Sequence, residues 1–332
     1  MAIIGIESLV YGVDDIARSQ LFFEDFGLTL SASGEAEAHF VLPEGSSIIL
    51  RKGDDPRLPV SDLVGFGVRE VVWGVDTVEA LEGVASNLAT DREIRRDEQG
   101  GLHFLTDFGI AMGLRLFRKR PVVTAPQPSN APNHVERLNQ PRRWRQRAFP
   151  KGIAHVVFAV PGFEAAHFFM RDRLGFRPTD EQVGFGMYLR ADGTNAHHNF
   201  LLLNALAPLP GMDGKPRFHH ANFVVEDLDE LMVGANHMTR RGWKPSHFGL
   251  GRHRVDSALF YYLPCPAGGE AEYGADSDCV DDSWVPRRWP EPLFAYAHFV
   301  HNLPPFLRTP PNWRIEYMTD AIEVVDTPKG DY

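Results

Sequence analysis

Four stretches of this 332-residue chain begin alike, and this repetition constrains the fold more than any other feature. Each stretch has a short apolar segment, a break, and then a segment with the apolar spacing of a helix. The four stretches are SLVYGVDDIARSQLFFEDFG from Ser8, EVVWGVDTVEALEGVASNL from Glu70, HVVFAVPGFEAAHFFMRDRLG from His155 and HANFVVEDLDELMVGANHM from His220. Further strand-like segments follow each stretch. The pattern predicts an α+β fold of four tandem βαβββ modules that form two barrel-like domains.

The repeat and the composition also predict where the chain divides. We expect an N-terminal module pair in residues 1–118 and a second pair, carrying the candidate site, in residues 151–285. Residues 119–150 contain six prolines among polar and basic residues, which is typical of an exposed linker. Residues 286–332 lie beyond the repeats, and their apolar content predicts a tail that packs on the body.

Charge and cysteine content exclude several classes of protein. The net charge of −10 argues against a nucleic-acid or anionic membrane surface. Only two cysteines occur, Cys265 and Cys279, so a disulfide scaffold is excluded and a reducing compartment is expected. The N-terminus has no signal-peptide pattern, and no apolar run approaches the ~20 residues of a membrane span. We therefore expect a cytoplasmic protein.

Two histidines occupy matching positions in the repeats. His155 opens the third module and His220 opens the fourth, so an approximate two-fold pairing of these modules would bring them together. The stretch CPAGGEAEYGAD adds two carboxylates, Glu270 and Glu272, which share one face of a strand. Two imidazoles and one carboxylate leave up to three coordination positions open, which suits non-haem iron(II). The residues alone do not decide between the two glutamates.

The stretch GRHRVDSALFYYLPCPAGGEAEYG, residues 251–274, resembles a motif of the type I extradiol ring-cleaving dioxygenases. These enzymes include the catechol 2,3-dioxygenases and the dihydroxybiphenyl dioxygenases, and they belong to the vicinal oxygen chelate superfamily. Their motif has a histidine, a tyrosine nine residues later, and a ligand glutamate ten residues after the tyrosine. His253, Tyr262 and Glu272 match that spacing, so the resemblance selects Glu272 over Glu270 as the metal ligand.

The resemblance also implies roles for the histidines. The strand GIAHVVFAV matches the one that carries the first metal ligand of the family, which implies His155. The second ligand is commonly the latter of a His-His pair, which implies His220 rather than His219. The stretch NAHHNFLLL implies His198, in preference to His197, as the catalytic acid and base.

The same resemblance implies the reaction. The cofactor would be Fe(II), with Mn(II) as a possible substitute, and the chain would use O2 to cleave a substituted catechol next to its ortho-diol. The product would be of the muconic semialdehyde type, and His253 and Tyr262 would hydrogen-bond the bound catecholate. No cofactor besides the metal, no nucleic acid and no membrane is expected as a partner, and the protein would be a homo-oligomer.

Relatives with the same fold supply the alternatives. One is a hydroquinone-type ring-cleaving dioxygenase, which also uses two histidines and a glutamate. A glyoxalase-like isomerase is another, although such sites have four protein ligands. The third is a metal-free protein that binds an aromatic compound or an antibiotic.

The N-terminal module pair has no matching ligand set. The positions that correspond to the three ligands hold Ser8, Glu70 and, by the repeat alignment, Met112. A serine, a glutamate and a methionine do not make a site with two histidines. We therefore expect one metal ion per chain, with the first half in a supporting role.

Overall fold

The computed structural model describes residues 3–209, 211–318 and 322–325, and it confirms the predicted α+β fold of four βαβββ modules. The first module consists of β1 (Ile3–Val13), α1 (Ile16–Phe26), β2 (Thr29–Ser33), β3 (Glu37–Val41) and β4 (Ser47–Lys52). The second consists of β5 (Gly67–Val75), α2 (Val78–Leu88), β6 (Arg95–Arg96), β7 (Leu102–Leu105) and β8 (Ala111–Leu116).

The second half of the chain repeats this order of elements. The third module consists of β9 (Gly152–Val160), α3 (Phe163–Leu174), β10 (Arg177–Gln182), β11 (Gly186–Arg190) and β12 (Phe200–Asn204). The fourth consists of β13 (Arg217–Val224), α4 (Leu228–Arg240), β14 (Gly251–Arg252), β15 (Leu259–Pro264) and β16 (Glu270–Ala275). The tail adds β17 (Arg287–Trp289), α5 (Pro292–Tyr296), β18 (Phe299–Val300), a 3-10 turn (Pro305–Leu307), β19 (Ile315–Met318) and β20 (Ile322–Val325).

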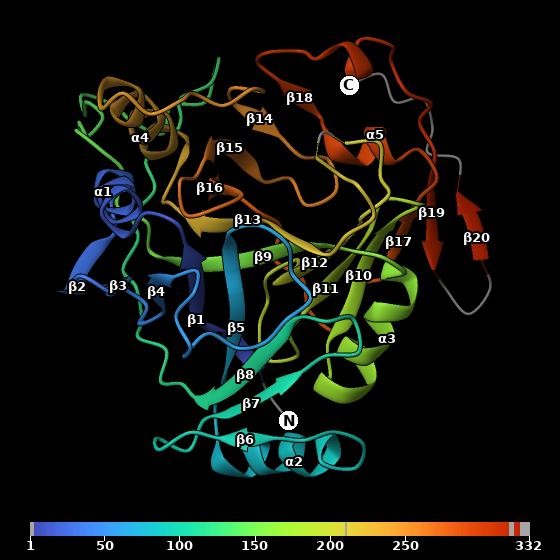
Figure 1. Ribbon diagram of the computed structural model, residues 1–332. Coiled ribbons are helices and arrows are strands. Elements are labelled where there is room, and N and C mark those ends of the chain that lie inside the picture. Colours follow the sequence, from blue (N-terminus) through green and yellow to red (C-terminus); the bar gives the residue numbers. More distant parts are fainter. Residues whose placement is uncertain (1–2, 210, 319–321, 326–332) are drawn as a thin grey trace.

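Each pair of modules builds one sheet around two antiparallel central strands. In the first sheet the order is β2-β3-β4-β1-β5-β8-β7-β6, with β1 and β5 antiparallel at its centre. The second sheet has the order β18-β14-β15-β16-β13-β9-β12-β11-β10-β17-β19-β20, with β9 and β13 antiparallel at its centre. In Figure 1 the central strands of the two sheets cross at a steep angle. The tail extends the second sheet at both edges.

Glycines end two of the helices. Gly27 follows α1 with φ 109°, and Gly175 follows α3 with φ 74°, which is the left-handed conformation that glycine adopts without strain. At Gly27 a second constraint applies, because a Cβ atom there would collide with the carbonyl oxygen of Ala148. At the other end of α1, the side chain of Asp15 accepts a hydrogen bond from the backbone N–H of Arg18 at 2.9 Å.

A continuous hydrophobic core joins the two halves of the chain. Phe26 of α1 stacks on Tyr273 of β16 with ring centroids 4.0 Å apart, and the Tyr273 hydroxyl donates to the carbonyl oxygen of Phe26 at 2.7 Å. Trp73 of β5 packs edge-on against Phe176, with centroids 4.9 Å apart. Each sheet therefore packs one of its two faces against the other sheet.

The other face of the second sheet packs partly against the tail. Val156 and Phe158 of β9 belong to the shared core, whereas Val157 and Ala159 contact a smaller cluster that contains Trp289 and Phe294. Alternate residues of a strand point to opposite faces. His155 therefore lies on the face of Val157 and Ala159, which is the face that the tail partly covers.

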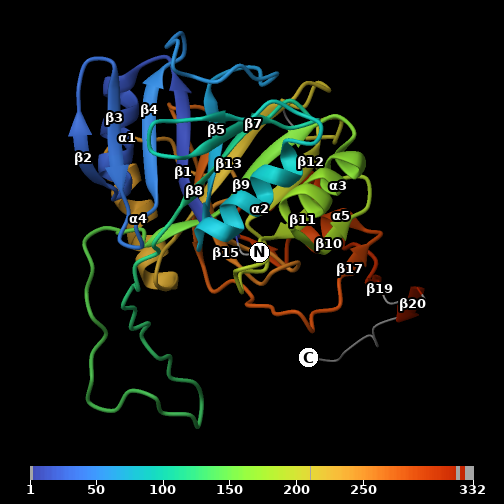
Figure 2. The same ribbon diagram turned by 90° about the horizontal axis from the view of Figure 1, so that it is seen from below.

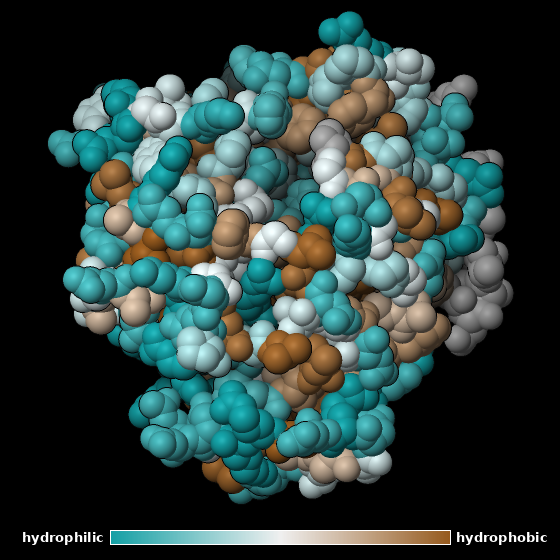
Figure 3. All heavy atoms as spheres, in the orientation of Figure 1, coloured by the Kyte–Doolittle hydropathy of each residue, from teal (hydrophilic) through white to brown (hydrophobic). Residues whose placement is uncertain are grey.

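Residues 119–150, all of them described, form no helix or strand and are mostly exposed. Figure 2 shows this green segment looping away from the body. Arg142 anchors it by an ion pair with Asp229 of α4 at 2.8 Å, and Arg145 pairs with Glu226. The surface in Figure 3 is mostly hydrophilic, with hydrophobic residues in scattered patches. Among the described helices, none is both long and apolar enough to cross a membrane.

Candidate metal centre

Strand register places the three predicted ligands on neighbouring strands. Asn222 of β13 pairs with His155 of β9 on one side and with Glu272 of β16 on the other. His220 lies two residues before Asn222 on the same strand, so its side chain points to the same face. His155 Nε2 lies 3.3 Å from His220 Nε2 and 3.3 Å from Glu272 Oε2, and His220 Nε2 lies 3.2 Å from Glu272 Oε2.

These distances fit a shared divalent ion. Ligand atoms bound to one ion at about 2.1 Å lie about 3 to 3.4 Å apart for right-angled or tetrahedral geometry. Both carboxylate oxygens of Glu272 are buried without a hydrogen-bond partner, although the residue is 0% exposed. Burial alone would raise the pKa of Glu272, but the interactions with His155 and His220 outweigh it and hold the pKa well below its usual range. A buried, ionised and unpartnered carboxylate is what a metal ligand offers.

Glu270, the rival carboxylate, lies outside this cluster. Among the described residues, two three-residue groups have ligand atoms that all fall within 4.8 Å of one another: His155, His220 and Glu272 form one, and His197, His198 and Asp256 form the other. Neither group contains Glu270. Burial, and then the charge of Glu272, raise the pKa of Glu270 to about 7. The geometry therefore agrees with the selection that the motif spacing made.

His219 orients its neighbour His220. The Nδ1 atoms of the two rings lie 2.7 Å apart. Burial, together with the charge of His220, lowers the pKa of His219 to about 3, so this ring is neutral and can accept a hydrogen bond at Nδ1. The His220 Nδ1–H then donates, which leaves His220 Nε2 free for an ion. Such outer partners commonly fix the tautomer of a ligand histidine.

The structure separates the two adjacent histidines 197 and 198. The His198 ring stacks on His155 with centroids 4.2 Å apart, next to the candidate ligands. Its pKa is lowered well below the usual value by burial and then by the neighbouring histidines, foremost His155. His197 instead pairs through Nε2 with Asp180 Oδ2 at 2.7 Å. Of the two, His198 is the one in contact with the metal cluster.

His253 and Tyr262 lie together on the other side of Glu272. His253 Nδ1–H donates to the carbonyl oxygen of Tyr296 at 2.6 Å, and His253 Nε2 forms a hydrogen bond with the Tyr262 hydroxyl at 3.1 Å. His253 Nε2 lies 3.9 Å from Glu272 Oε1. Burial, and then the charge of Glu272, raise the pKa of Tyr262 well above its ordinary value, so the hydroxyl stays protonated.

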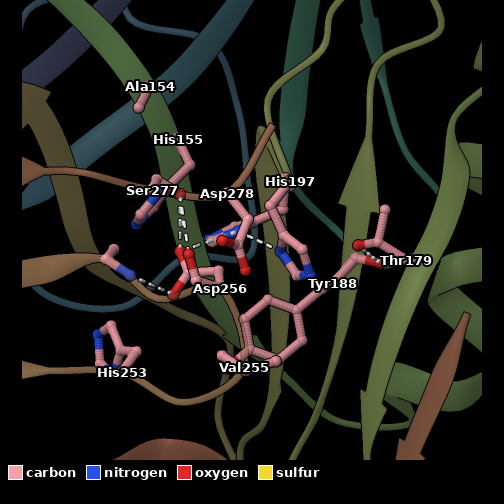
Figure 4. A network of polar contacts seen from close by, with 12 residues as sticks. Ala154, His155, Thr179, Tyr188, His197, His253, Val255, Asp256, Ser277 and Asp278 are labelled. Atoms are coloured by element: carbon pink, nitrogen blue, oxygen red, sulfur yellow. Dashed lines mark hydrogen bonds and ion pairs between the residues drawn. The ribbon is translucent and has the colours of Figure 1, made fainter. Parts of the chain in front are cut away.

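The sequence did not predict three residues that lie near the site: Asp256, Tyr188 and Tyr296. Asp256 accepts a hydrogen bond from the Ser277 hydroxyl at 3.1 Å, and Figure 4 shows it with Tyr188 and His197 to one side and His253 to the other. It stands three residues after His253 in the quoted motif, and that proximity was the available signal. The tyrosines had no such signal, because no spacing in the sequence ties Tyr188 or the tail residue Tyr296 to this face.

A cavity of about 420 Å³ reaches His155 and His198. Asn222, Asp256 and Ala258 also line it, so polar and apolar groups both face the space. Asn222 lies on β13 and Ala258 in the loop before β15. Of the three candidate ligands, His155 lines this cavity. A single aromatic ring is small enough for this volume.

Comparison with characterised proteins identifies the relatives. No family model matches the chain. Metapyrocatechase 2 of Cupriavidus necator is 25% identical over 315 residues, which cover 92% of this chain and 90% of that protein. An iron-dependent extradiol dioxygenase of Rhodococcus jostii is 27% identical over 257 residues, which cover 71% and 83%. The chain is an extradiol dioxygenase homologue.

Solved structures of extradiol dioxygenases and a glyoxalase share its fold. A 2,2',3-trihydroxybiphenyl 1,2-dioxygenase from Sphingomonas wittichii superposes with a TM-score of 0.67 at 17% identity and covers 90% of this chain and 99% of that one. An Mn(II)-bound glyoxalase from Novosphingobium aromaticivorans gives 0.67 at 21% identity, with coverage of 89% and 90%. This likeness establishes the vicinal oxygen chelate fold.

The N-terminal half of this dioxygenase homologue corrects one prediction. Strand pairing matches Ser8 to His155 and Glu70 to His220, as expected. The residue that matches Glu272 is Gly113, because Gly113 pairs with Val72 as Glu272 pairs with Asn222. The prediction of Met112 was wrong by one residue. A shift of one residue moves a side chain to the opposite face, and the Met112 sulfur accordingly lies in the core, 3.5 Å from Trp73 Nε1.

Proposed function

We propose that this chain is an iron(II)-dependent extradiol dioxygenase that cleaves a substituted catechol, with His155, His220 and Glu272 as the metal ligands. One observation carries the proposal: Glu272 presents two buried, unpartnered oxygens beside the Nε2 atoms of two histidines. Two nitrogen ligands and one oxygen ligand on one face suit iron(II), and manganese(II) can occupy the same set. The manganese-bound relative of the same fold supports that alternative.

The protein groups around the metal fit an ortho-diol. A bound divalent ion would supply the Lewis acidity that lowers the pKa of the diol and the redox activity towards dioxygen. Tyr262 and His253 form a hydrogen-bonded pair beside Glu272, so they can exchange that pair for hydrogen bonds to a catechol oxygen. His198, neutral and stacked on His155, is placed to accept and return a proton on the other side.

The reaction would add both atoms of dioxygen to the substrate. The ring bond next to the two hydroxyl-bearing carbons breaks, the O–O bond breaks, and the product carries an aldehyde or ketone and a carboxylate. No further reductant is required, because the ring supplies all four electrons. The subunits are expected to assemble as a homo-oligomer, which sedimentation of the metal-loaded protein would test.

The test is an assay of iron-loaded protein with catechol, 3-methylcatechol and 2,3-dihydroxybiphenyl under air. We expect a yellow ring-opened product, and with ¹⁸O2 we expect both labelled atoms in it. Cleavage of hydroquinones but not of catechols would favour the hydroquinone-type enzyme. Binding of catechols without turnover, in protein shown to contain iron, would contradict the proposed reaction.

A further inference from the structure

A chain of buried polar contacts runs from His198 to the tail. His198 Nδ1 lies 3.1 Å from His197 Nδ1, and His197 Nε2 lies 2.7 Å from Asp180 Oδ2. Arg287 of β17 then binds both oxygens of Asp180, with Nε to Oδ1 at 2.9 Å and Nη2 to Oδ2 at 2.7 Å. The chain thus starts at the residue stacked on His155 and ends beyond the four modules.

Packing holds the far end of this chain in place. Asp180 is 0% exposed, and its Oδ1 also accepts from the backbone N–H of Arg287 at 2.9 Å. The guanidinium of Arg287 lies 4.5 Å from the ring centroid of Trp284 and 5.0 Å from that of Trp289. β17 pairs in parallel with β10, which carries Asp180. The position of the carboxylate is therefore set by several contacts at once.

The partners determine where the protons lie. Asp180 is held as a carboxylate and only accepts, so His197 must donate to it from Nε2. Arg287 already balances the charge of Asp180, and a cationic His197 would add an unbalanced buried charge. His197 is then neutral, with a lone pair at Nδ1. His198 must donate to that lone pair from Nδ1, which leaves the lone pair of His198 on Nε2.

Asp256 is the other acceptor near His198, and it does not compete. Its Oδ2 lies 3.8 Å from His198 Nδ1, beyond hydrogen-bond range. That oxygen already accepts from the Ser277 hydroxyl, and Oδ1 accepts from the backbone N–H of Ala258 at 3.3 Å. The shorter contact to His197 therefore decides the tautomer of His198.

We propose that Arg287 and Asp180 are positioning residues that act through His197 to hold His198 in the tautomer protonated at Nδ1. The proposal assigns a role to the tail segment that carries β17, and it rests on the proposed function for its effect on turnover. His198 is thereby held with an unprotonated Nε2, which is the state of a general base. The contribution of the tail is electrostatic and geometric, because none of its residues in this chain of contacts touches the metal ligands.

The tautomer can be measured without turnover. Zinc-loaded protein labelled with ¹⁵N-histidine would give the protonation of each ring nitrogen by NMR, with His198→Asn assigning the His198 signals. We expect Nδ1 of His198 protonated and Nε2 unprotonated. In Asp180→Asn, the amide oxygen would face Arg287 and the amide NH2 would donate to His197, so we expect both tautomers to reverse. An unchanged His198 tautomer in this variant would overturn the proposal.

Kinetics on the iron-loaded enzyme give the second readout. Asp180→Asn should lower kcat by about 10²–10⁴-fold, the range that runs up to the loss a wrong histidine tautomer causes elsewhere, with iron content and anaerobic catechol binding unchanged. Arg287→Gln should lower kcat less, by about 10-fold, and Arg287→Lys should recover part of the loss. The matched control is Arg288→Gln, which removes the adjacent ion pair from Arg288 to Glu181 at 3.2 Å in the same strand pair.

The outcomes separate this proposal from the proposed function. If the control and Arg287→Gln lose the same activity, the tail has only a structural role and the positioning proposal is wrong. If Asp180→Asn and Arg287→Gln keep the wild-type kcat while the wild type cleaves catechols, ring cleavage stands and the positioning role fails. If the wild type cleaves no catechol but the tautomers reverse as expected, the arrangement is confirmed and the proposed reaction fails.

Discussion

The two sheets carry a buried glutamate on corresponding faces, but the hydrogen bonding of that glutamate differs between the two halves of the chain. In the second half, Glu272 is buried with both oxygens unpartnered beside two histidines. In the first half, Glu70 occupies the position of His220, and its Oε1 lies 2.6 Å from His103 Nδ1. His103 pairs with Gly113 as Tyr262 pairs with Glu272, so it matches the tyrosine of the second half.

On this face of the first half, Glu70, His103, Asp97 and Arg115 pair with one another. His103 Nε2 lies 3.1 Å from Asp97 Oδ2, and Arg115 donates to the same oxygen at 2.6 Å. A cavity of about 620 Å³ lies over Ser8, Glu70 and His103, and it is larger than the one at His155. The fold thus provides a cavity on both sheets. At the ligand positions, however, Glu70 of the first half pairs with His103, whereas both oxygens of Glu272 in the second half have no hydrogen-bond partner. An unpartnered carboxylate between two histidines, and not cavity volume, distinguishes the candidate metal centre.

The largest effect should follow from loss of a ligand in the second half. We expect His155→Ala, His220→Ala or Glu272→Ala to remove bound metal and to reduce ring cleavage to background. Two protein ligands bind a divalent ion much more weakly than three. Metal analysis after desalting, together with the catechol assay, measures both. The protein should stay folded, since none of these three side chains belongs to the shared hydrophobic core.

Two matched carboxylates serve as controls for that comparison. Glu270→Ala changes the second carboxylate of β16, and Glu70→Ala changes the buried carboxylate of the first half. Both variants should retain metal and activity. Loss of metal from Glu270→Ala, with retention in Glu272→Ala, would show that the ligand register is wrong by two residues.

The next largest effect should come from His198. We expect His198→Asn to lower kcat by ~10²–10⁴-fold, the usual contribution of a positioned acid or base. Iron content and anaerobic catechol affinity should remain near those of the wild type, because His198 stacks on His155 without being a ligand itself. The catalytic role would belong to His197 if two results were found together. His198→Asn would be active, and His197→Asn would be inactive while its His198 kept the wild-type tautomer.

The sequence predicted the fold and the candidate ligands because both rest on local patterns. The repeated starts fixed the module order, and the spacing from Tyr262 to Glu272 lies within one hairpin, where register follows from residue count. Met112 was misplaced although the β7–β8 and β15–β16 hairpins have the same spacing, since His103 pairs with Gly113 as Tyr262 pairs with Glu272. The second and fourth modules differ in length before these hairpins, so counting residues along the repeat does not give the register. Asp180 and Arg287 were not predicted, since 107 residues separate them and only the tail's docking on β10 brings them together.

Metal stoichiometry offers a smaller but direct test of the comparison. We expect fully loaded protein to contain about one iron per chain, because the first half presents Ser8, Glu70 and Gly113 at the ligand positions. A side chain at Gly113 would also meet the carbonyl oxygen of Leu102, which lies 2.9 Å from where its Cβ would stand. Elemental analysis near two metals per chain, with one metal still bound in Glu272→Ala, would place a second site in the first half.

The smallest effect concerns the stability that the ion pairs give the first half. His103→Ala should lower the free energy of unfolding by about 1–3 kcal/mol near pH 6, the usual cost of losing hydrogen bonds to charged groups. It should leave metal content and kcat unchanged.

The hydrogen bond to Glu70 outweighs burial and raises the pKa of His103 in the folded protein. A raised pKa stabilises the fold fully below the unfolded value of about 6.5, and this contribution is lost as the pH rises through the folded value. The difference between wild type and variant in urea unfolding should therefore shrink from pH 6 to pH 9, and a difference that grew with pH would show that His103 is neutral in the fold.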